Sequence, residues 1–422
     1  MSRIFTGFGF GPIQAGLFVR EVARSRNFDR IVIGEIDQIL IHAVRRNKGS
    51  YCINIAEKDG IRTEIMEGVE VYNPSLPPER KKLIDSVSAS TEMATCLPAV
   101  SAYKTGGLSS VAAILEAGLK KQSAPGTLIY TAENHMHAAE ILRSSLSGTG
   151  INSTSKLQFL NTVIGKMSRV VSSPDEINLL GLAPIVPGFP KAFLLEAFNH
   201  ILVDRSKLPD LTPGIPSFME KDKLLPFEEA KLFGHVAIHA LLAYLGGYKG
   251  LRSMARVCEN SLLMEIARDA FIHESGRALC KKYASLQDPL FTMQGFSAYA
   301  QDLLERMANP FLGDTVERAG RDIKRKLGPE DRLFGTIACA AQQGVQAPNM
   351  ALGTLAAIAV LIKQGEEHQL PGPLRTKELK AMDRDYLQQL ISWLWRDTEK
   401  LPSPELLQAL MEAKEKLINL QD

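Results

Sequence analysis

The chain has 422 residues, of which 45% are hydrophobic and 23% are charged. This is an ordinary globular composition, and the length is enough for two domains that each have their own core. Its 49 basic and 47 acidic residues leave a net charge of +2, so no global electrostatic field argues for a nucleic acid partner.

Cysteine usage and the apolar runs indicate a cytoplasmic protein. The five cysteines are scattered and include no CxxC pair, which is typical of free thiols in a reducing compartment. The N-terminal sequence MSRIFTGFGFG lacks both a basic n-region and a long apolar run, so we expect no signal peptide. The longest apolar run, near residues 350–362, is too short for the roughly 20 residues of a membrane-spanning helix.

Residues 1–193 alternate short β-like runs with helical stretches. This alternation is typical of βαβ units and a mostly parallel sheet, so we predict an α/β Rossmann domain. The expected elements, in chain order, are a strand over residues 4–8, a helix to about residue 26, a strand over 30–36, a helix over 38–46, a paired β insert over 51–56 and 62–66, and strands over 88–96, 127–131 and 157–161.

Residues 194–422 have a different pattern, in which helical periodicity dominates, and we expect an all-α domain. The predicted helices cover residues 228–245, 262–283, 296–308, 329–343, 351–364 and 386–420. Residues 208–223 are rich in proline and polar residues and are predicted to form a connecting loop. Beyond helical packing, the sequence assigns no function to the chain after about residue 361.

The first predicted strand leads into the sequence GFGPIQAG, which begins at Gly9. Glycines between a strand and a helix allow a tight turn and a close backbone approach to a pyrophosphate, which the helix N-terminus attracts. Gln14 replaces the third glycine of the dinucleotide fingerprint, so a shifted helix has to accommodate it, with Gly16 relieving part of the crowding. The candidate loop residues are Gly9, Gly11, Pro12, Ile13 and Gln14.

Glu35 ends the second predicted strand, where an acid can bind the 2′-hydroxyl of the adenosine ribose. Its carboxylate would repel a 2′-phosphate, so the sequence favours NAD over NADP. Taken alone, the glycine pattern and one acid are also compatible with an unliganded turn and an exposed loop residue.

Several stretches resemble the polyol-specific long-chain dehydrogenases. AKLFGHVAIHALLAYLGGYKG, residues 230–250, resembles the helix that holds the catalytic lysine of this family. RMANPFLGDTVERAGRDIKRKLGPEDRL, residues 306–333, is similar to a signature stretch of the mannitol 1-phosphate 5-dehydrogenase group. GSYCI, AENHMHAAEIL and EAFNHILVD follow in the family's order, so the resemblance covers roughly residues 1–340.

The resemblance implies a metal-independent alcohol dehydrogenase with a lysine as general base and hydride transfer to C4 of a nicotinamide. The family pattern is a lysine, four residues, an asparagine, two residues and a histidine, and Lys231 and His239 match its ends. The asparagine position is Val236, which removes a donor to the developing alkoxide. Losing one such donor can cost about 2.7–4 kcal/mol.

A second departure lies in LNTVIGKMSRVV, residues 160–171. Where the family has an aspartate that helps to bind substrate hydroxyls, followed by an arginine, this chain has Gly165 and Lys166. We expect both changes to fall in the polyol pocket, where they weaken the case for mannitol 1-phosphate itself as the substrate.

Lys231, His235 and His239 are spaced i, i+4 and i+8, so they follow one face of the predicted helix. A lysine bordered by apolar residues loses hydration, which lowers its pKa and suits it to act as a base; a solvated lysine in the first helical turn is the alternative. The two histidines also have a metal-ligand spacing, but no third ligand is evident and we expect no metal. We expect His239 to donate to the substrate oxygen and His235 to replace part of the missing asparagine.

Three further residues are assigned to the substrate by their positions in the family pattern. Arg318 and Lys326 are the basic residues that face the substrate in the family, and the basic cluster around them suits a phosphate. The same cluster is also compatible with a solvated helix. Asn134, in AENH, matches an asparagine near the nicotinamide, although asparagine also caps helices.

The leading hypothesis is an NAD-dependent oxidoreductase that interconverts a polyol, in particular a sugar-alcohol phosphate, and its keto sugar. One alternative is a catalytically weak dinucleotide-binding or regulatory protein on the same scaffold. Another is a dehydrogenase of a less hydroxylated anionic substrate, which the less polar positions Gly165 and Val236 would admit. The expected partner is a small molecule, with no nucleic acid and no membrane.

Overall fold

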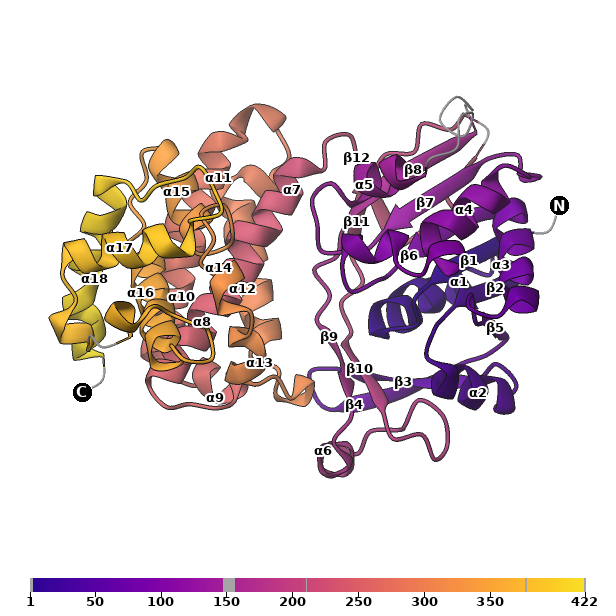
Figure 1. Ribbon diagram of the computed structural model, residues 1–422, viewed down its shortest axis with the longest axis horizontal. Helices are drawn as coiled ribbons and strands as arrows, with labels where there is room; N and C mark the ends of the chain where they lie inside the picture. Colours follow the sequence, from indigo (N-terminus) through magenta and orange to yellow (C-terminus); the bar gives the residue numbers. More distant parts are fainter. Residues whose placement is uncertain (1–2, 147–155, 210, 376–377, 421–422) are drawn as a thin grey trace. The chain divides into compact units, whose positions relative to one another are not determined.

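The computed structural model describes residues 3–146, 156–209, 211–375 and 378–420. The chain divides into two compact units, Met1–Phe227 and Glu228–Asp422 (Figure 1). The division therefore lies after residue 227 and not, as expected, after residue 193. The reason is that strands beyond residue 193 pair with strands that precede it.

The first unit contains an eight-stranded sheet with the order β12-β11-β8-β7-β6-β1-β2-β5. Its strands are β1 (Ile4–Phe8), β2 (Arg30–Gly34), β5 (Val69–Tyr72), β6 (Ser90–Thr95), β7 (Thr127–Thr131), β8 (Leu157–Val163), β11 (Ile201–Asp204) and β12 (Phe218–Lys221). All neighbours are parallel except β8 and β11, so the predicted mostly parallel sheet is confirmed. β12 lies within the expected connecting loop of residues 208–223, so that loop prediction is wrong in this part.

A second, four-stranded sheet has the order β4-β3-β10-β9. Its strands are β3 (Tyr51–Ala56), β4 (Ile61–Met66), β9 (Ser168–Val171) and β10 (Ala192–Glu196). β3 and β4 are antiparallel, which confirms the predicted β insert. The insert also pairs with β10, which the sequence pattern did not indicate.

Two hydrophobic cores cover the opposite faces of the large sheet, because alternate residues of each strand point to opposite sides. One core joins the helix after β1 to both sheets and includes Phe5 and Phe18. The other packs α3, α4 and α5 on the second face and includes Phe8 and Leu115. The helices of this unit are η1 (Gln14–Phe18), α1 (Val19–Ser25), α2 (Gln38–Arg46), α3 (Pro77–Ala89), α4 (Val111–Leu119), α5 (Ala138–Ser145) and α6 (Pro174–Leu179).

The second unit is helical, as predicted, with α16 buried along most of its length and packed against α8 and α18 (Figure 1). Its helices, with α7 at the division, are α7 (Leu225–Glu229), η5 (Ala230–Val236), α8 (Ala237–Tyr248), α9 (Met254–Cys258), α10 (Ser261–Asp269), η6 (Ala270–Gly276), α11 (Arg277–Lys282), α12 (Met293–Met307), α13 (Val316–Gly320), α14 (Ile323–Lys326), α15 (Phe334–Gln342), α16 (Pro348–Lys363), α17 (Arg384–Leu394) and α18 (Pro404–Asn419).

The expected single helix over residues 386–420 is wrong, because the chain leaves the helical conformation between α17 and α18. The sequence Leu401-Pro402-Ser403-Pro404 explains the break: Ser403 caps α18 and Pro404 occupies its first turn. No helix in the described residues is long and apolar enough to cross a membrane.

Candidate functional site

The loop after β1 is built for close approach of another group. Gly9 has φ of +82°, and an added Cβ would lie 2.6 Å from the carbonyl oxygen of Cys96. An added Cβ at Gly11 would meet nothing within 4 Å, so the chain is open at this point. The helix then begins at Pro12 and Ile13, with Pro12 at a first-turn position where its missing N–H is harmless.

Gln14 is accommodated by a widened helical turn. Its side chain is fully buried and occupies the space that a side chain on Gly7 would need. The π-helical turn η1 starts at Gln14, which is the shift of the helix that this residue was expected to require. Neither atom of its amide has a hydrogen-bond partner among the described residues. Gly16 lies against Leu195 of β10 and therefore serves the packing of helix on strand, not the space around Gln14.

Glu35 lies beside the glycine loop, as the dinucleotide fingerprint requires. Its Oε2 accepts a hydrogen bond of 2.6 Å from the backbone N–H of Phe10. Its Oε1 accepts bonds from the N–H groups of Ile36 and Asp37, at 2.7 and 2.8 Å. The carboxylate therefore ties the loop after β1 to the loop after β2.

Asn134 lies exposed in the loop after β7. The N-cap of the following helix, α5, is His137, so Asn134 is not a helix cap.

The residue before Asn134, Glu133, is buried and accepts hydrogen bonds from Thr95 Oγ1 (2.9 Å), Leu97 N–H (2.8 Å) and the Tyr103 hydroxyl. Burial raises the pKa of Glu133, and those donors oppose the shift. The loops after β1, β2, β6 and β7 thus all lie at the carboxyl edge of parallel strands, where open α/β sheets bind ligands.

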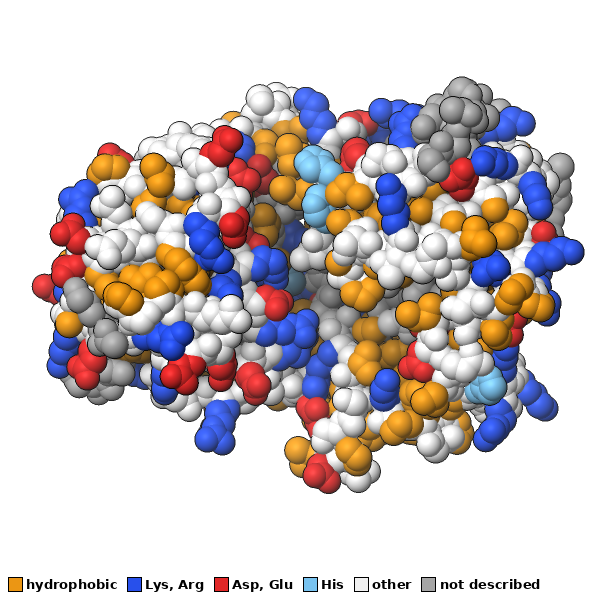
Figure 2. All heavy atoms as spheres, in the orientation of Figure 1, with side chains coloured by type: hydrophobic (Ala, Val, Ile, Leu, Met, Phe, Trp, Pro, Cys, Tyr) orange, Lys and Arg blue, Asp and Glu red, His pale blue; other side chains and the backbone are white. Residues whose placement is uncertain are grey.

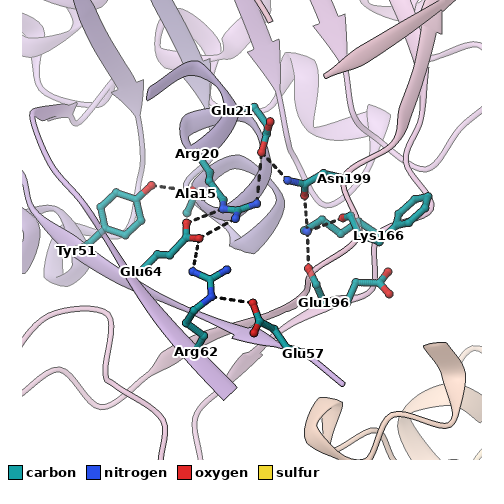
Figure 3. A network of polar contacts seen from close by, with 11 residues as sticks. Ala15, Arg20, Glu21, Tyr51, Glu57, Arg62, Glu64, Lys166, Glu196 and Asn199 are labelled. Carbon is teal, nitrogen blue, oxygen red and sulfur yellow. Dashed lines mark hydrogen bonds and ion pairs between the residues drawn. The ribbon is translucent and has the colours of Figure 1, made fainter. Parts of the chain in front are cut away.

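Lys166 holds the main chain and is not available as the basic residue of a polyol pocket. It is buried, and its Nζ donates to the carbonyl oxygens of Glu196 (2.5 Å) and Phe198 (2.6 Å) and to Asn199 Oδ1 (2.7 Å), as Figure 3 shows. The amide of Asn199 donates in turn to Glu21 of α1 at 2.5 Å. Lys166 therefore fixes the chain between β10 and β11 against the helix that follows the glycine loop.

The other end of the same network anchors α1 to the β insert (Figure 3). Arg20 makes a two-point contact with the carboxylate of Glu64, with both distances 2.7 Å, and Arg62 contacts the same carboxylate. These hydrogen bonds, first that of Arg20, lower the pKa of Glu64 to about 2. The helix that begins at the glycine loop is thus held from two sides.

In the second unit, Lys231 lies in the π-helical turn η5 and is half-buried. Burial lowers the pKa of its ammonium to about 8; the negative charge of Glu228 opposes this shift, and the positive charge of Arg332 adds to it. π-Helical turns occur mostly as single turns within α-helices and often at functional sites. A lysine with such a pKa can both accept and release a proton near neutral pH.

His239 belongs to a chain of three polar side chains. Its Nε2 lies 3.0 Å from Asp314 Oδ2, and Asp314 Oδ1 accepts a hydrogen bond of 2.8 Å from Arg318 Nε. Burial alone would raise the pKa of Asp314, but His239 and Arg318 hold it far below its usual range. The ionised carboxylate therefore orients the imidazole through Nε2 and leaves Nδ1 for any further partner.

His235 is buried and stays neutral. Burial, followed by the positive charges of Arg306, His239 and Lys231, holds its pKa well below the usual value. Its Nδ1 is sealed from solvent and has no hydrogen-bond partner among the described residues. Any polar contact of this ring with a small molecule would therefore use Nε2.

Lys326 is almost fully buried, with a relative exposure of 4%. Its Nζ donates to the carbonyl oxygen of Ala319 and lies 5.9 Å from the centre of the Tyr244 ring. Burial, followed by the positive charges of Arg332 and Arg325, lowers its pKa to about 7. The alternative of a solvated lysine on a helix surface does not apply to this residue.

The residues that sequence reasoning proposed form a group within each unit. The loop residues and Glu35 come together in the first unit, and Lys231, His235 and His239 follow one helix in the second. Sequence reasoning missed Asp314 and Arg332; the i, i+4 spacing of Asp314 and Arg318 was a usable signal. No group of three or more metal-ligating side chains occurs in the part of the chain that the structure describes.

Comparison with known proteins agrees with this arrangement. Residues 223–415 match the family model described as mannitol dehydrogenase C-terminal domain. Among solved structures, the mannitol 2-dehydrogenase of Pseudomonas fluorescens, a ternary complex with NAD and D-mannitol, is 14% identical with a TM-score of 0.70, over 100% of this chain and 93% of that one. A D-sorbitol dehydrogenase in substrate-free form is 12% identical with a TM-score of 0.77, over 100% of this chain and 95% of that one.

The chain therefore has the fold of these two polyol dehydrogenases, and its residues 223–415 are similar to a mannitol dehydrogenase C-terminal domain. This confirms the expected resemblance at the level of domain and fold.

Proposed function

We propose that this protein is an NAD-dependent oxidoreductase that interconverts a polyol, in particular a polyol phosphate, and its keto form. The observation that carries the proposal is Lys231: a half-buried lysine with a pKa near 8, in a widened turn of the helix that begins a mannitol dehydrogenase C-terminal domain. The full-length likeness to two polyol dehydrogenases supports the same reaction class.

The glycine loop and Glu35 are the proposed cofactor site. Gly9 permits the positive φ of the turn, Gly11 leaves the backbone open, and the free N–H groups at the start of the helix suit a pyrophosphate. Glu35 favours an unphosphorylated ribose by charge, which is the basis for NAD over NADP. Bound NAD supplies a hydride acceptor at C4 of its nicotinamide.

Lys231 is the proposed general base. Its neutral amine takes the proton of the reacting hydroxyl as the carbinol carbon gives up its hydride, and its ammonium returns a proton when the ketone is reduced. His239, oriented by Asp314, and His235, neutral and buried, are the proposed polar contacts of the reacting oxygen. Arg318 and Asn134 remain proposed substrate contacts.

A decisive experiment replaces Lys231 with methionine, which keeps an unbranched side chain and removes the base. Turnover of polyol phosphates should fall by roughly 10²- to 10⁴-fold, while the affinity for NADH stays unchanged. Lys281→Met, which removes an exposed lysine of α11, is the matched control and should keep full turnover. Equal turnover in wild type and Lys231→Met would overturn the mechanism.

One observation favours a second candidate, a dinucleotide-binding protein with little catalysis. Val236 occupies the place of an amide donor in the helix of Lys231, and it brings no polar group. If NADH binds to the wild type but no polyol or polyol phosphate is turned over, this second function replaces the first.

A further inference from the structure

Arg332 is a buried cation whose hydrogen-bonding capacity is largely unused. Its relative exposure is 7%, and its Nε contacts Asp331 Oδ1 at 2.6 Å. Among the described residues, neither terminal nitrogen, Nη1 or Nη2, has a hydrogen-bond partner, and neither is sealed from solvent. A guanidinium has five N–H donors, so most of those on Arg332 are available to another group.

Asp331 does not neutralise Arg332 fully, because it also pairs with Arg325 at 3.1 Å. Lys326, also nine-tenths buried, uses one of its three N–H groups, for Ala319. Arg332 lies close enough to both Lys326 and Lys231 to lower the pKa of each. Cations therefore outnumber carboxylates around Arg332: its cationic neighbours are Lys231, Arg321, Arg325 and Lys326, and its acidic neighbours are Glu228, Asp322 and Asp331.

The described residues on the face drawn in Figure 2 form no broad basic surface. On the face drawn in Figure 2, basic and acidic side chains are intermingled over both units. Buried like charges are unfavourable unless an opposite charge compensates them. The geometry therefore calls for an anion beside Arg332 and Lys326, and a planar guanidinium with two parallel N–H groups matches an oxyanion with two acceptor oxygens.

We propose that Arg332 and Lys326 bind the phosphate group of the substrate, and that Arg332 is the residue that distinguishes a phosphorylated polyol from a free one. The identity of the substrate rests on the proposed dehydrogenase function, whereas the anion site itself does not. Arg332 donates Nη1–H and Nη2–H to two oxygens of the tetrahedral oxyanion, and Lys326 contributes its charge and a donor.

The test is a calorimetric titration of the full-length protein with sulfate, carried out in the presence of NADH. Sulfate is the probe because it does not change its protonation near neutral pH. Arg332→Met should weaken sulfate binding roughly 10- to 100-fold, since charged hydrogen bonds are lost. Arg256→Gln, which removes an exposed arginine of α9 paired with Glu259, is the control and should bind sulfate as the wild type does. Equal sulfate affinity in Arg332→Met and wild type overturns the proposal.

Protonation of Lys326 gives an independent readout. A bound anion favours its charged form, so sulfate should cause proton uptake near pH 7 to 8, measured as a difference in heat between two buffers. The charged groups that act on this lysine are Arg321, Asp322, Arg325 and Arg332. Lys326→Met should abolish the uptake; uptake that persists in this variant also counts against the site.

Stability shows whether Arg332→Met folds. Because the change removes a buried cation that lacks full compensation, the variant without sulfate should melt at or above the wild-type temperature. Sulfate should raise the melting temperature of the wild type more than that of the variant. A variant that melts far below the wild type in the absence of sulfate would make Arg332 a structural ion-pair partner instead.

Activity separates this inference from the proposed function. Arg332→Met should raise KM for a polyol phosphate by a much larger factor than KM for the unphosphorylated polyol; both substrates are compared at the same pH, because the charge of Arg332 also lowers the pKa of Lys231. If Arg332→Met binds sulfate more weakly than the wild type but the wild type has no dehydrogenase activity, the anion site is supported and the proposed dehydrogenase function is overturned. Dehydrogenase activity with equal sulfate binding overturns the anion site alone.

Discussion

Two lysines of the second unit have lowered pKa values for related reasons but with different consequences. Lys231 is half-buried and keeps the favourable charge of Glu228 nearby, so its pKa of about 8 lies just above neutral pH. Lys326 is almost fully buried among cations, so its pKa of about 7 lies lower. In the proposed reaction the first exchanges a proton with the substrate, and the second gains its proton when an anion is bound.

The pH dependence of the reaction should identify Lys231. Because the base is active when neutral, kcat/KM for the oxidation of an unphosphorylated polyol, which needs no proton on Lys326, should rise about tenfold per pH unit below about pH 8 and level off above it. Ketone reduction requires the ammonium, so its rate should fall through the same pH. Initial rates in both directions measure this.

The Lys326→Met variant is the control for this profile, because it removes the other lysine with a lowered pKa. The profile of oxidation should keep its inflection near pH 8 in that variant. An oxidation rate that does not change around pH 8 would show that another group is the base.

At the scale of single residues, sequence reasoning identified the residue types and missed most of their partners. Lys231 and His239 could be identified from the sequence alone, because their spacing along the chain matches a family pattern. Asp314, which orients His239, lies 75 positions away along the chain, so only the folded helices bring the two together. Lys166 illustrates the converse. We expected it to lie in the polyol pocket, but its ammonium donates to two main-chain carbonyl oxygens and one side-chain amide oxygen.

At the scale of elements, widened turns interrupt helices at both candidate sites. η1 follows the glycine loop, η5 contains Lys231, and a third turn, η6, packs Phe271 against Gly234 of η5. A sequence read with a period of 3.6 residues predicts the helices but not the turns, because one extra residue hardly changes an apolar pattern. The type of each element, helix or strand, was therefore largely predictable. Which side chains share one face of a helix was not.

Substitution of Gln14 tests how much free energy of unfolding is lost by burying its amide in η1. Its buried amide lacks partners, and an unsatisfied buried group costs about 1–3 kcal/mol, so Gln14→Met should increase the free energy of unfolding by about 1 kcal/mol or more. The affinity for NADH should not change, because the side chain points to Gly7 and not to the mouth of the loop. Urea unfolding and a NADH titration measure the two effects.

Asn54 provides the matched control for Gln14. Its side chain is equally buried, but its amide donates to the carbonyl oxygens of Ala183 and Phe193 and accepts from the N–H of Ala183. Asn54→Leu should therefore destabilise the protein. If Gln14→Met destabilises it as well, the amide of Gln14 has a stabilising role that its contacts do not explain.

At the scale of the whole molecule, each unit has its own ligand in the proposed function. NADH should slow amide exchange in residues 9–18 and 35–37, and sulfate should slow it in residues 319–332, because binding stabilises the segments that hold the ligand. Hydrogen exchange followed by mass spectrometry would locate both effects. Protection by sulfate that is confined to residues 9–18 would instead assign the anion to the glycine loop.

The presence of two units was predictable, because the sequence changes from alternating strands and helices to helices alone. The position at which the chain divides was not predictable. Residues 192–221 contain β10, β11 and β12; β10 and β11 pair with β3 and β8, which precede this segment in the chain, and β12 pairs with β11. Short strands that pair at long range leave little periodicity in the local sequence, whereas the helices after residue 228 leave a great deal.

The wide turn η5 makes the spacing of Lys231 and His239 a matter of chain length as well as of residue type. A deletion of Leu232 would leave both side chains in the sequence and change no charge. It would close the turn toward α-helical geometry and keep Lys231 and His239 at nearly the same angle around the helix axis, because the wide turn accommodates one extra residue. For this helix, the loss of one codon in frame would therefore separate the contribution of the wide turn from that of the two side chains.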